Sequence, residues 1–125
     1  MSRSVVRRRG KQTVLVPRVK VWLEAGHSYA FGYGLCMILQ GVDRAGSIKG
    51  AALDLGLSYR HVWGRIKEAE RALGRRLVET HVGGRDPQRS ALTPEARRLV
   101  ADFLDLRARM IELVQREFSR RFGQR

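Results

Sequence analysis

Near the middle of this 125-residue chain stand Ser58, Tyr59 and Arg60, and Trp63 and Lys67 follow the tyrosine at intervals of four residues. The guanidinium of Arg60 can donate two hydrogen bonds to O6 and N7 of guanine, the acceptors that this base presents in the major groove of DNA. Ser58 can cap the first turn of a helix, and the free N–H groups of that turn suit a phosphate oxygen. These residue types at this spacing indicate contacts with a nucleic acid.

A helix from Tyr59 to about Leu73 must position these side chains. Helical projection places Val62 and Ile66 on the face that packs on a core, with Arg60 and Gly64 on the opposite face. The two aromatic side chains could equally shield the margin of that core. The candidate DNA contacts on this segment are Ser58, Tyr59, Arg60, Trp63, Gly64 and Lys67.

A shorter helix, Ile48–Leu55, precedes this one. Ser47 is a suitable N-cap for it and a further candidate for phosphate binding. Gly56 can adopt the positive φ of a tight turn, so the two helices meet across about three residues. This arrangement is a helix-turn-helix, although a helical hairpin with another purpose could share it.

The next segment is predicted to form a wing. Residues 77–82 and 90–93 have the pattern of two strands, and the turn-rich sequence 83–89 between them carries Arg85 and Arg89. Both arginines are candidates for the DNA backbone or the minor groove. We expect an earlier strand, 19–24, to complete the same small antiparallel sheet.

The two ends of the chain have different characters. Residues 1–18 are predicted to form a flexible basic arm, or a start without a role, and a helix is expected at about 30–44 after a turn at 26–28. The winged helix-turn-helix then occupies 19–93, and 94–125 form a long helix that begins after the capping Thr93.

The long helix carries apolar residues at the spacing of a heptad seam. We expect this seam to pair two copies of the chain into a homodimer; the alternatives are a second apolar stripe as the seam, or both stripes packed within one monomer. The predicted seam residues are Leu99, Phe103, Leu106, Met110 and Leu113.

Composition favours a polyanionic partner. Lysine and arginine total 25 against 12 acidic residues, which gives a formal net charge of +13. One cysteine, Cys36, rules out a disulfide scaffold, and with three histidines it forms no metal-ligand spacing. We therefore expect no metal, no cofactor and no enzymatic activity.

The uncharged stretch 25–42 holds four glycines, so we expect no membrane helix and a cytoplasmic protein.

The chain resembles the N-terminal domain of ModE-type molybdate-responsive regulators over about residues 19–120, and more distantly the LysR-type winged helices. The resemblance lies in a Gly-Ser-Ile start, a Ser-Tyr-Arg entry to the second helix, a tryptophan four residues after the tyrosine, and a Gly-Gly wing that ends in Leu-Thr. The matching residues are Gly46–Ile48, Ala51, Ala52, Leu55–Arg60, Trp63, Ile66, Leu77–Glu79, Gly83, Gly84 and Ala91–Thr93.

The resemblance implies a transcriptional regulator that is mainly α-helical, dimerises through its long last helix and binds operator DNA. It places Ser58, Tyr59, Arg60 and Trp63 on the DNA-reading helix. The wing departs from the family pattern, because Arg85–Ser90 is charged and holds a proline. Family members continue into an oxyanion-binding domain, and we expect none within this chain.

The leading hypothesis is a sequence-specific, homodimeric DNA-binding regulator with residues 59–73 in the major groove. The alternatives are a nucleoid-type protein with little sequence preference, or an adaptor that binds RNA or protein. Arg75 and Arg76 precede the wing and could meet phosphates, whereas Arg71 is expected to face solvent.

Overall fold

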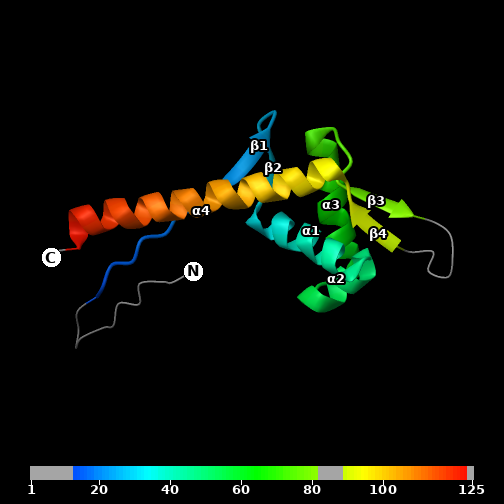
Figure 1. Ribbon diagram of the computed structural model, residues 1–125, viewed down its shortest axis with the longest axis horizontal. Helices are drawn as coiled ribbons and strands as arrows, with labels where there is room; N and C mark the ends of the chain where they lie inside the picture. Colours follow the sequence, from blue (N-terminus) through cyan, green and yellow to red (C-terminus); the bar gives the residue numbers. More distant parts are fainter. Residues whose placement is uncertain (1–12, 82–88, 124–125) are drawn as a thin grey trace.

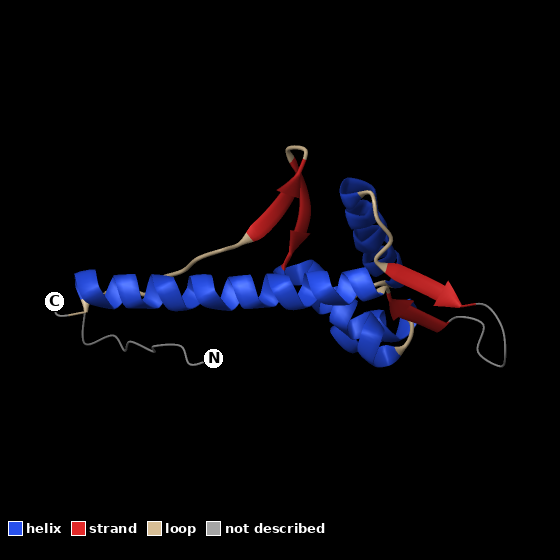
Figure 2. Ribbon diagram, turned by 45° about the horizontal axis from the view of Figure 1, so that its top comes forward, coloured by secondary structure: helices blue, strands red, loops and turns tan. Residues whose placement is uncertain are grey.

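The computed structural model describes residues 13–81 and 89–123, which form four α-helices and two antiparallel β-hairpins (Figures 1 and 2). In chain order the elements are β1 (Trp22–Ala25), β2 (Ser28–Gly32), α1 (Tyr33–Ala45), α2 (Ile48–Leu55), α3 (Tyr59–Leu73), β3 (Val78–His81), β4 (Arg89–Leu92) and α4 (Pro94–Phe122). This architecture confirms the predicted class, a mainly helical winged helix-turn-helix with a long C-terminal helix.

Hydroxyl side chains begin three of these helices. Ser47 Oγ and Ser58 Oγ each accept a hydrogen bond from the backbone N–H three residues further on, at 2.9 and 3.0 Å. Thr93 Oγ1 does the same at the start of α4, at 3.1 Å. Each bond satisfies an N–H group that the first helical turn leaves without a partner. The predicted starts of α2, α3 and α4 are confirmed. They could be predicted because each cap involves residues only three positions apart.

The first hairpin corrects two expectations about the N-terminal part. β1 pairs with β2, whereas the sequence predicted that residues 19–24 would join the sheet of the wing. Gly26 and His27 form the turn, and both have positive φ (55° and 70°), as tight two-residue hairpin turns require. The strand therefore finds its partner in the residues that follow it. β2 continues through Gly32, so α1 begins at Tyr33 and not near residue 30.

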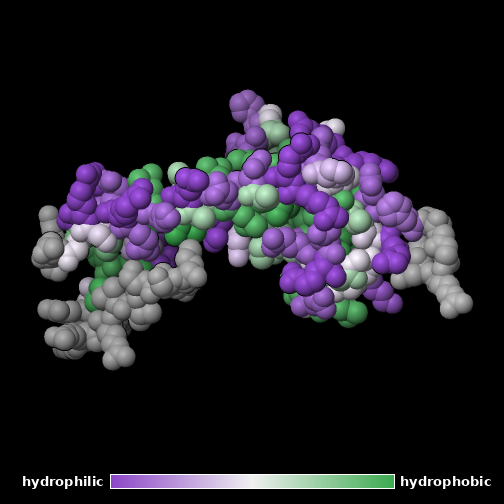
Figure 3. Space-filling model, viewed as in Figure 1, coloured by the Kyte–Doolittle hydropathy of each residue, from purple (hydrophilic) through white to green (hydrophobic). Residues whose placement is uncertain are grey.

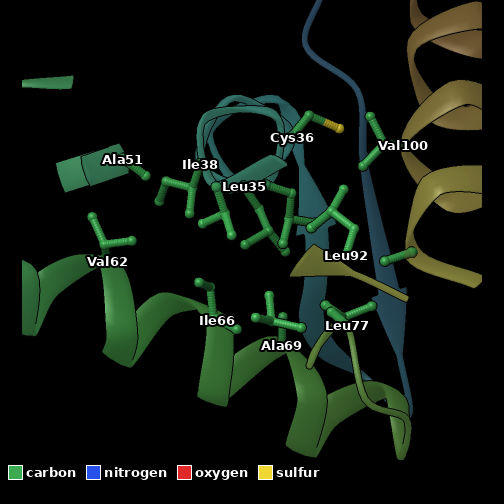
Figure 4. Close-up of a cluster of buried hydrophobic side chains, with 14 of the residues drawn as sticks. Leu35, Cys36, Ile38, Ala51, Val62, Ile66, Ala69, Leu77, Leu92 and Val100 are labelled. Carbon is green, nitrogen blue, oxygen red and sulfur yellow. The ribbon is translucent and has the colours of Figure 1, made fainter. Parts of the chain in front are cut away.

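α1 is the central helix of the core and packs against α2, α3, α4 and β4. In Figure 4 the side chains of Leu35 and Ile38 lie above α3, and Val100 lies on the side of α4. Val62 and Ile66 form the face of α3 that meets this cluster. The core thus holds α3 by one face only.

Cys36 belongs to the same core and has no exposed surface. Burial raises the pKa of its thiol to about 12, against the opposing effect of the positive charge of Arg107. The thiol is therefore neutral at physiological pH and packs as a small apolar side chain.

α4 begins over the core and extends well beyond it (Figures 1 and 2). Phe103 is 1% exposed, and its ring meets the ring of Phe31 edge-on with centroids 5.4 Å apart. The prediction that Phe103 belongs to a dimer seam is therefore wrong, because this side chain is enclosed within its own subunit. Leu99 is partly buried against the same core.

The far half of α4 keeps apolar side chains at the surface. Leu106 and Leu113 are 38% and 40% exposed, and Met110 between them is half-buried. Figure 3 shows apolar residues along α4 within a mostly hydrophilic surface. The predicted seam is thus divided, since its first part builds the domain and its later part stays accessible. None of the described helices is both long enough and apolar enough to cross a membrane.

Candidate nucleic-acid interface

The turn between α2 and α3 sets the direction of the second helix. Gly56 has φ 68°, a left-handed conformation that costs glycine no steric penalty. Its N–H donates to the carbonyl of Leu53 at 3.2 Å, and the N–H of Leu57 donates to the carbonyl of Ala52 at 2.9 Å. These bonds close α2, and α3 starts three residues after the glycine, as the helix-turn-helix prediction requires.

α3 buries one face and presents the other. Val62 and Ile66 are 0% and 1% exposed. Arg60 and Gly64 lie on the opposite face, and Arg60 is exposed. A methyl group placed on Gly64 would meet no other atom within 4 Å. Another molecule can therefore approach the backbone of α3 closely at this glycine.

Tyr59, Trp63 and Lys67 lie on the flank of α3 that faces the second hairpin, and not on its outermost line. All three line a surface hollow between α2, α3 and the β3–β4 hairpin. The two aromatic side chains are 48% and 44% exposed, and Lys67 Nζ lies 5.7 Å from the ring centroid of Trp63. Since Ile66 lines the same hollow, these rings border the core and remain accessible as well.

The other walls of the hollow are rich in polar groups. Ser47 and Lys49 come from the start of α2, while Thr80 and Ser90 come from β3 and β4 and share a hydrogen bond of 3.3 Å. In the caps of α2 and α3 the oxygens of Ser47 and Ser58 act as acceptors. Each hydroxyl therefore keeps its hydrogen as a possible donor to a phosphate.

Glu70 fixes the second hairpin to α3, a role that the sequence reasoning missed. Its Oε2 accepts hydrogen bonds from the backbone N–H groups of Leu77 at 2.8 Å and Val78 at 3.2 Å, and its Oε1 lies 3.3 Å from Lys67 Nζ. A carboxylate near the C-terminal end of a helix opposes the helix dipole. That unfavourable position is a signal that such a residue has a nearby partner.

Backbone and hydroxyl groups hold the base of the hairpin from the other side. Thr93 Oγ1 donates to the carbonyl of Arg76 at 3.1 Å, and the N–H of Thr93 donates to the carbonyl of Leu77 at 3.0 Å. The N–H of Ser90 donates to the carbonyl of Gly46 at 2.8 Å. The hairpin therefore has a fixed orientation relative to α3 and to the corner between α1 and α2.

The predicted wing strands are confirmed with small shifts. β3 covers Val78–His81 where 77–82 were expected, and β4 covers Arg89–Leu92 where 90–93 were expected. Arg89 is exposed and lies opposite His81 in the register. Arg85 lies outside the described residues, as do the neighbouring positions 82–88.

Comparison with known proteins identifies this arrangement. Residues 35–97 match the family described as bacterial regulatory helix-turn-helix protein, lysR family, and this match covers half of the chain. The chain belongs to this family. The match runs from α1 through the second hairpin to the start of α4. LysR-family members are regulators and not enzymes, in agreement with the expectation from the sequence.

Curated relatives of this LysR-family chain are molybdenum-related proteins. The molybdenum transport protein ModE of Herbaspirillum seropedicae is 32% identical over 80 residues, which cover 64% of this chain and 30% of that protein. The molybdenum-pterin-binding protein MopB of Rhodobacter capsulatus is 30% identical over 77 residues, covering 62% and 28%. The chain thus spans less than a third of the length of these relatives. The resemblance to ModE-type regulators is confirmed.

A solved structure shares the fold of this LysR-family chain. The crystal structure of the CbnR DBD–DNA complex aligns with a TM-score of 0.50 and 25% sequence identity, over 74% of this chain and 97% of that chain. In that complex the matched chain is crystallised with DNA.

Proposed function

We propose that this chain binds duplex DNA as a homodimeric transcription regulator, with α3 in the major groove. The observation that carries the proposal is the accessible outer face of α3, where Arg60 stands opposite the buried Val62 and Ile66. A major groove about 12 Å wide admits such a helix. The similarity to a domain crystallised with DNA and the net charge of +13 support the same function.

In this arrangement Arg60 reads a base pair, since it lies in the first turn of α3 and its guanidinium suits a guanine edge. Tyr59, Trp63 and Lys67 line the side of the groove next to the hairpin and contact bases or sugars there. Gly64 allows the helix backbone to approach the DNA, because no side chain separates them.

Phosphate contacts hold the domain in register. Ser47 and Ser58 lie at the N-termini of α2 and α3, where the helix dipole and the first N–H groups attract an anion. The β3–β4 hairpin serves as the wing. Arg89, at the end of β4 that is farthest from α3 in the register, and Arg85, between the two strands in the sequence, lie on the backbone or in the minor groove.

Two copies pair through α4. Leu106, Met110 and Leu113 form the seam, with Leu99 at its edge, because these apolar side chains lie beyond the core or at its margin. In this division residues 94–125 dimerise, 19–93 bind DNA and 1–18 form a basic arm that adds sequence-independent affinity.

Selection of bound duplexes from a random pool, followed by footprinting, tests this function. The expected result is an enriched palindrome whose half-sites lie about one helical turn, roughly 34 Å, apart. Coating of DNA in proportion to its length, without a footprint, would identify a nucleoid-type protein instead. Tighter binding to RNA than to duplex DNA would identify an adaptor.

A further inference from the structure

A second cationic surface lies at the C-terminal end of α3. A shallow hollow at the base of the wing is lined by Lys67, Glu70, Arg71, Gly74, Arg75 and Arg76. The described part of the chain places four cations and one carboxylate around this hollow.

The carboxylates nearby leave part of this charge without a partner. Glu70 is engaged by Lys67 and by two backbone N–H groups of the wing. Arg75 lies 3.7 Å from Glu95 in an ion pair whose side chains are 62% and 47% exposed. Within residues 13–81 and 89–123, neither Arg71 nor Arg76 has an ion-pair partner. Both side chains are exposed. The exposed Arg75–Glu95 pair adds little stability, so Arg75 can exchange this partner for an anion at little cost.

The backbone that carries these arginines is held on both sides. The N–H groups of Gly74 and Arg75 donate to the carbonyl of Glu70 at 2.8 and 3.2 Å. The carbonyl of Arg76 accepts a hydrogen bond from Thr93 Oγ1 at 3.1 Å. The arginine side chains therefore start from fixed positions, which lowers the entropy that a bound anion must remove.

The length of α3 indicates what this surface meets. Arg71 lies eleven positions after Arg60, which corresponds to about 16.5 Å along the helix axis. Both side chains project from the same outer face. A major groove is only about 12 Å wide. If α3 enters the groove with its N-terminal turn and crosses it at an angle, Arg60 meets a base edge and the far end of α3 reaches the phosphates that border the groove.

We propose that Arg71, Arg75 and Arg76 form a binding site for phosphodiester groups of the DNA backbone, with Lys67 at its edge. This site rests on the proposed function and extends it. The sequence predicted that Arg71 only faces solvent, whereas here it binds a phosphate of the DNA backbone. It anchors the end of α3 opposite to the phosphate contacts of Ser58.

The test is an R71Q/R76Q variant of the 125-residue chain, titrated at several salt concentrations with two labelled probes. One probe is the duplex selected by the wild-type protein, and the other is a 25-base-pair duplex of random sequence. We expect affinity to fall by the same factor on both probes. The slope of log K against log salt should decrease by about 1.8 per subunit, at about 0.9 for each lost phosphate contact. R116Q/R120Q, which removes the same two charges from the exposed far half of α4, is the control and should leave the slope unchanged.

Other outcomes would overturn the site. A slope equal to that of wild type shows that these arginines meet only solvent. A loss confined to the selected duplex makes them base-reading residues. R71K/R76K keeps both charges and should keep the slope, so a loss in this variant as well would point to a structural role. Wild-type protein that binds neither duplex refutes the proposed function itself, a result distinct from an unchanged slope in the variant.

Discussion

At the scale of single residues, Arg60 gives the most direct test of base reading. Arg60→Ala should lose about 1–3 kcal/mol on the selected duplex and relax the preference at one base pair, because a bidentate contact disappears. Titration against duplexes changed at each position measures both effects. Arg60→Lys keeps the charge without the planar fork and should lose the preference as well. Equal weakening on selected and random DNA would show that Arg60 meets only phosphate.

Substitution of Gly64 should change the stability of the chain and its affinity for DNA in opposite directions. Gly64→Ala is expected to raise the free energy of unfolding by about 0.5–1 kcal/mol, since alanine favours the helix and its methyl group meets nothing. The same methyl group stands on the face proposed to meet DNA, so affinity for DNA should fall. Urea unfolding measures the change in stability, and DNA titration measures the change in affinity. Unchanged affinity in the stabilised variant would contradict the close approach at this position.

Gly56→Ala is the comparison for this substitution. Its methyl group would also meet nothing within 4 Å, but Gly56 has φ 68°. The variant should therefore lose about 1–2 kcal/mol of stability, because an L-residue is strained in the left-handed region.

Sequence periodicity could place Arg60 opposite Val62 and Ile66, because the repeat of an α-helix fixes which residues share a face. It could not show that Phe103 is enclosed, because a stripe of apolar residues has the same spacing whether it packs on its own domain or on a second copy. The role of Glu70 could not be predicted for a related reason. Its partners, Leu77 and Val78, reach it only through the direction that the chain takes after α3.

At the scale of elements, Glu70 tests the connection between α3 and the wing. Glu70→Ala leaves the N–H groups of Leu77 and Val78 without their acceptor and should cost about 1–3 kcal/mol of stability. Glu70→Gln keeps an acceptor oxygen and should cost less. Urea unfolding curves of the two variants provide the measurement. Equal stability of the alanine variant and wild type would mean that water replaces the carboxylate without loss.

Elements with local signals were predictable, whereas strand pairing was not. Ser47, Ser58 and Thr93 mark helix starts by chemistry within three residues of each cap. The strand 19–24 carried the right period, but its pattern gave no information on whether its partner was β2 or the wing. The positive φ of His27, which allows the tight turn, is rare outside glycine and has no clear sequence signal.

At the scale of the whole molecule, the exposed part of α4 predicts the oligomeric state. Leu106→Asp should prevent the proposed dimer from forming and leave a monomer, because a carboxylate would be buried in the proposed seam without a partner. Sedimentation velocity distinguishes the two states. Leu53→Asp, at a leucine that is 74% exposed on α2, is the control and should leave the dimer intact. A dimer that survives Leu106→Asp would move the contact to another face of the helix.

The 29 residues of α4 form a rod about 44 Å long, and α3, with the surface proposed to bind DNA, lies near one end of it. If two such rods overlap lengthwise, the amount of overlap fixes the distance between the two α3 surfaces. A slip of one heptad would move them by about 10 Å, or about three base-pair steps. Changes far from the DNA could thus alter the spacing that an operator must have while leaving the sequence of each half-site as it is.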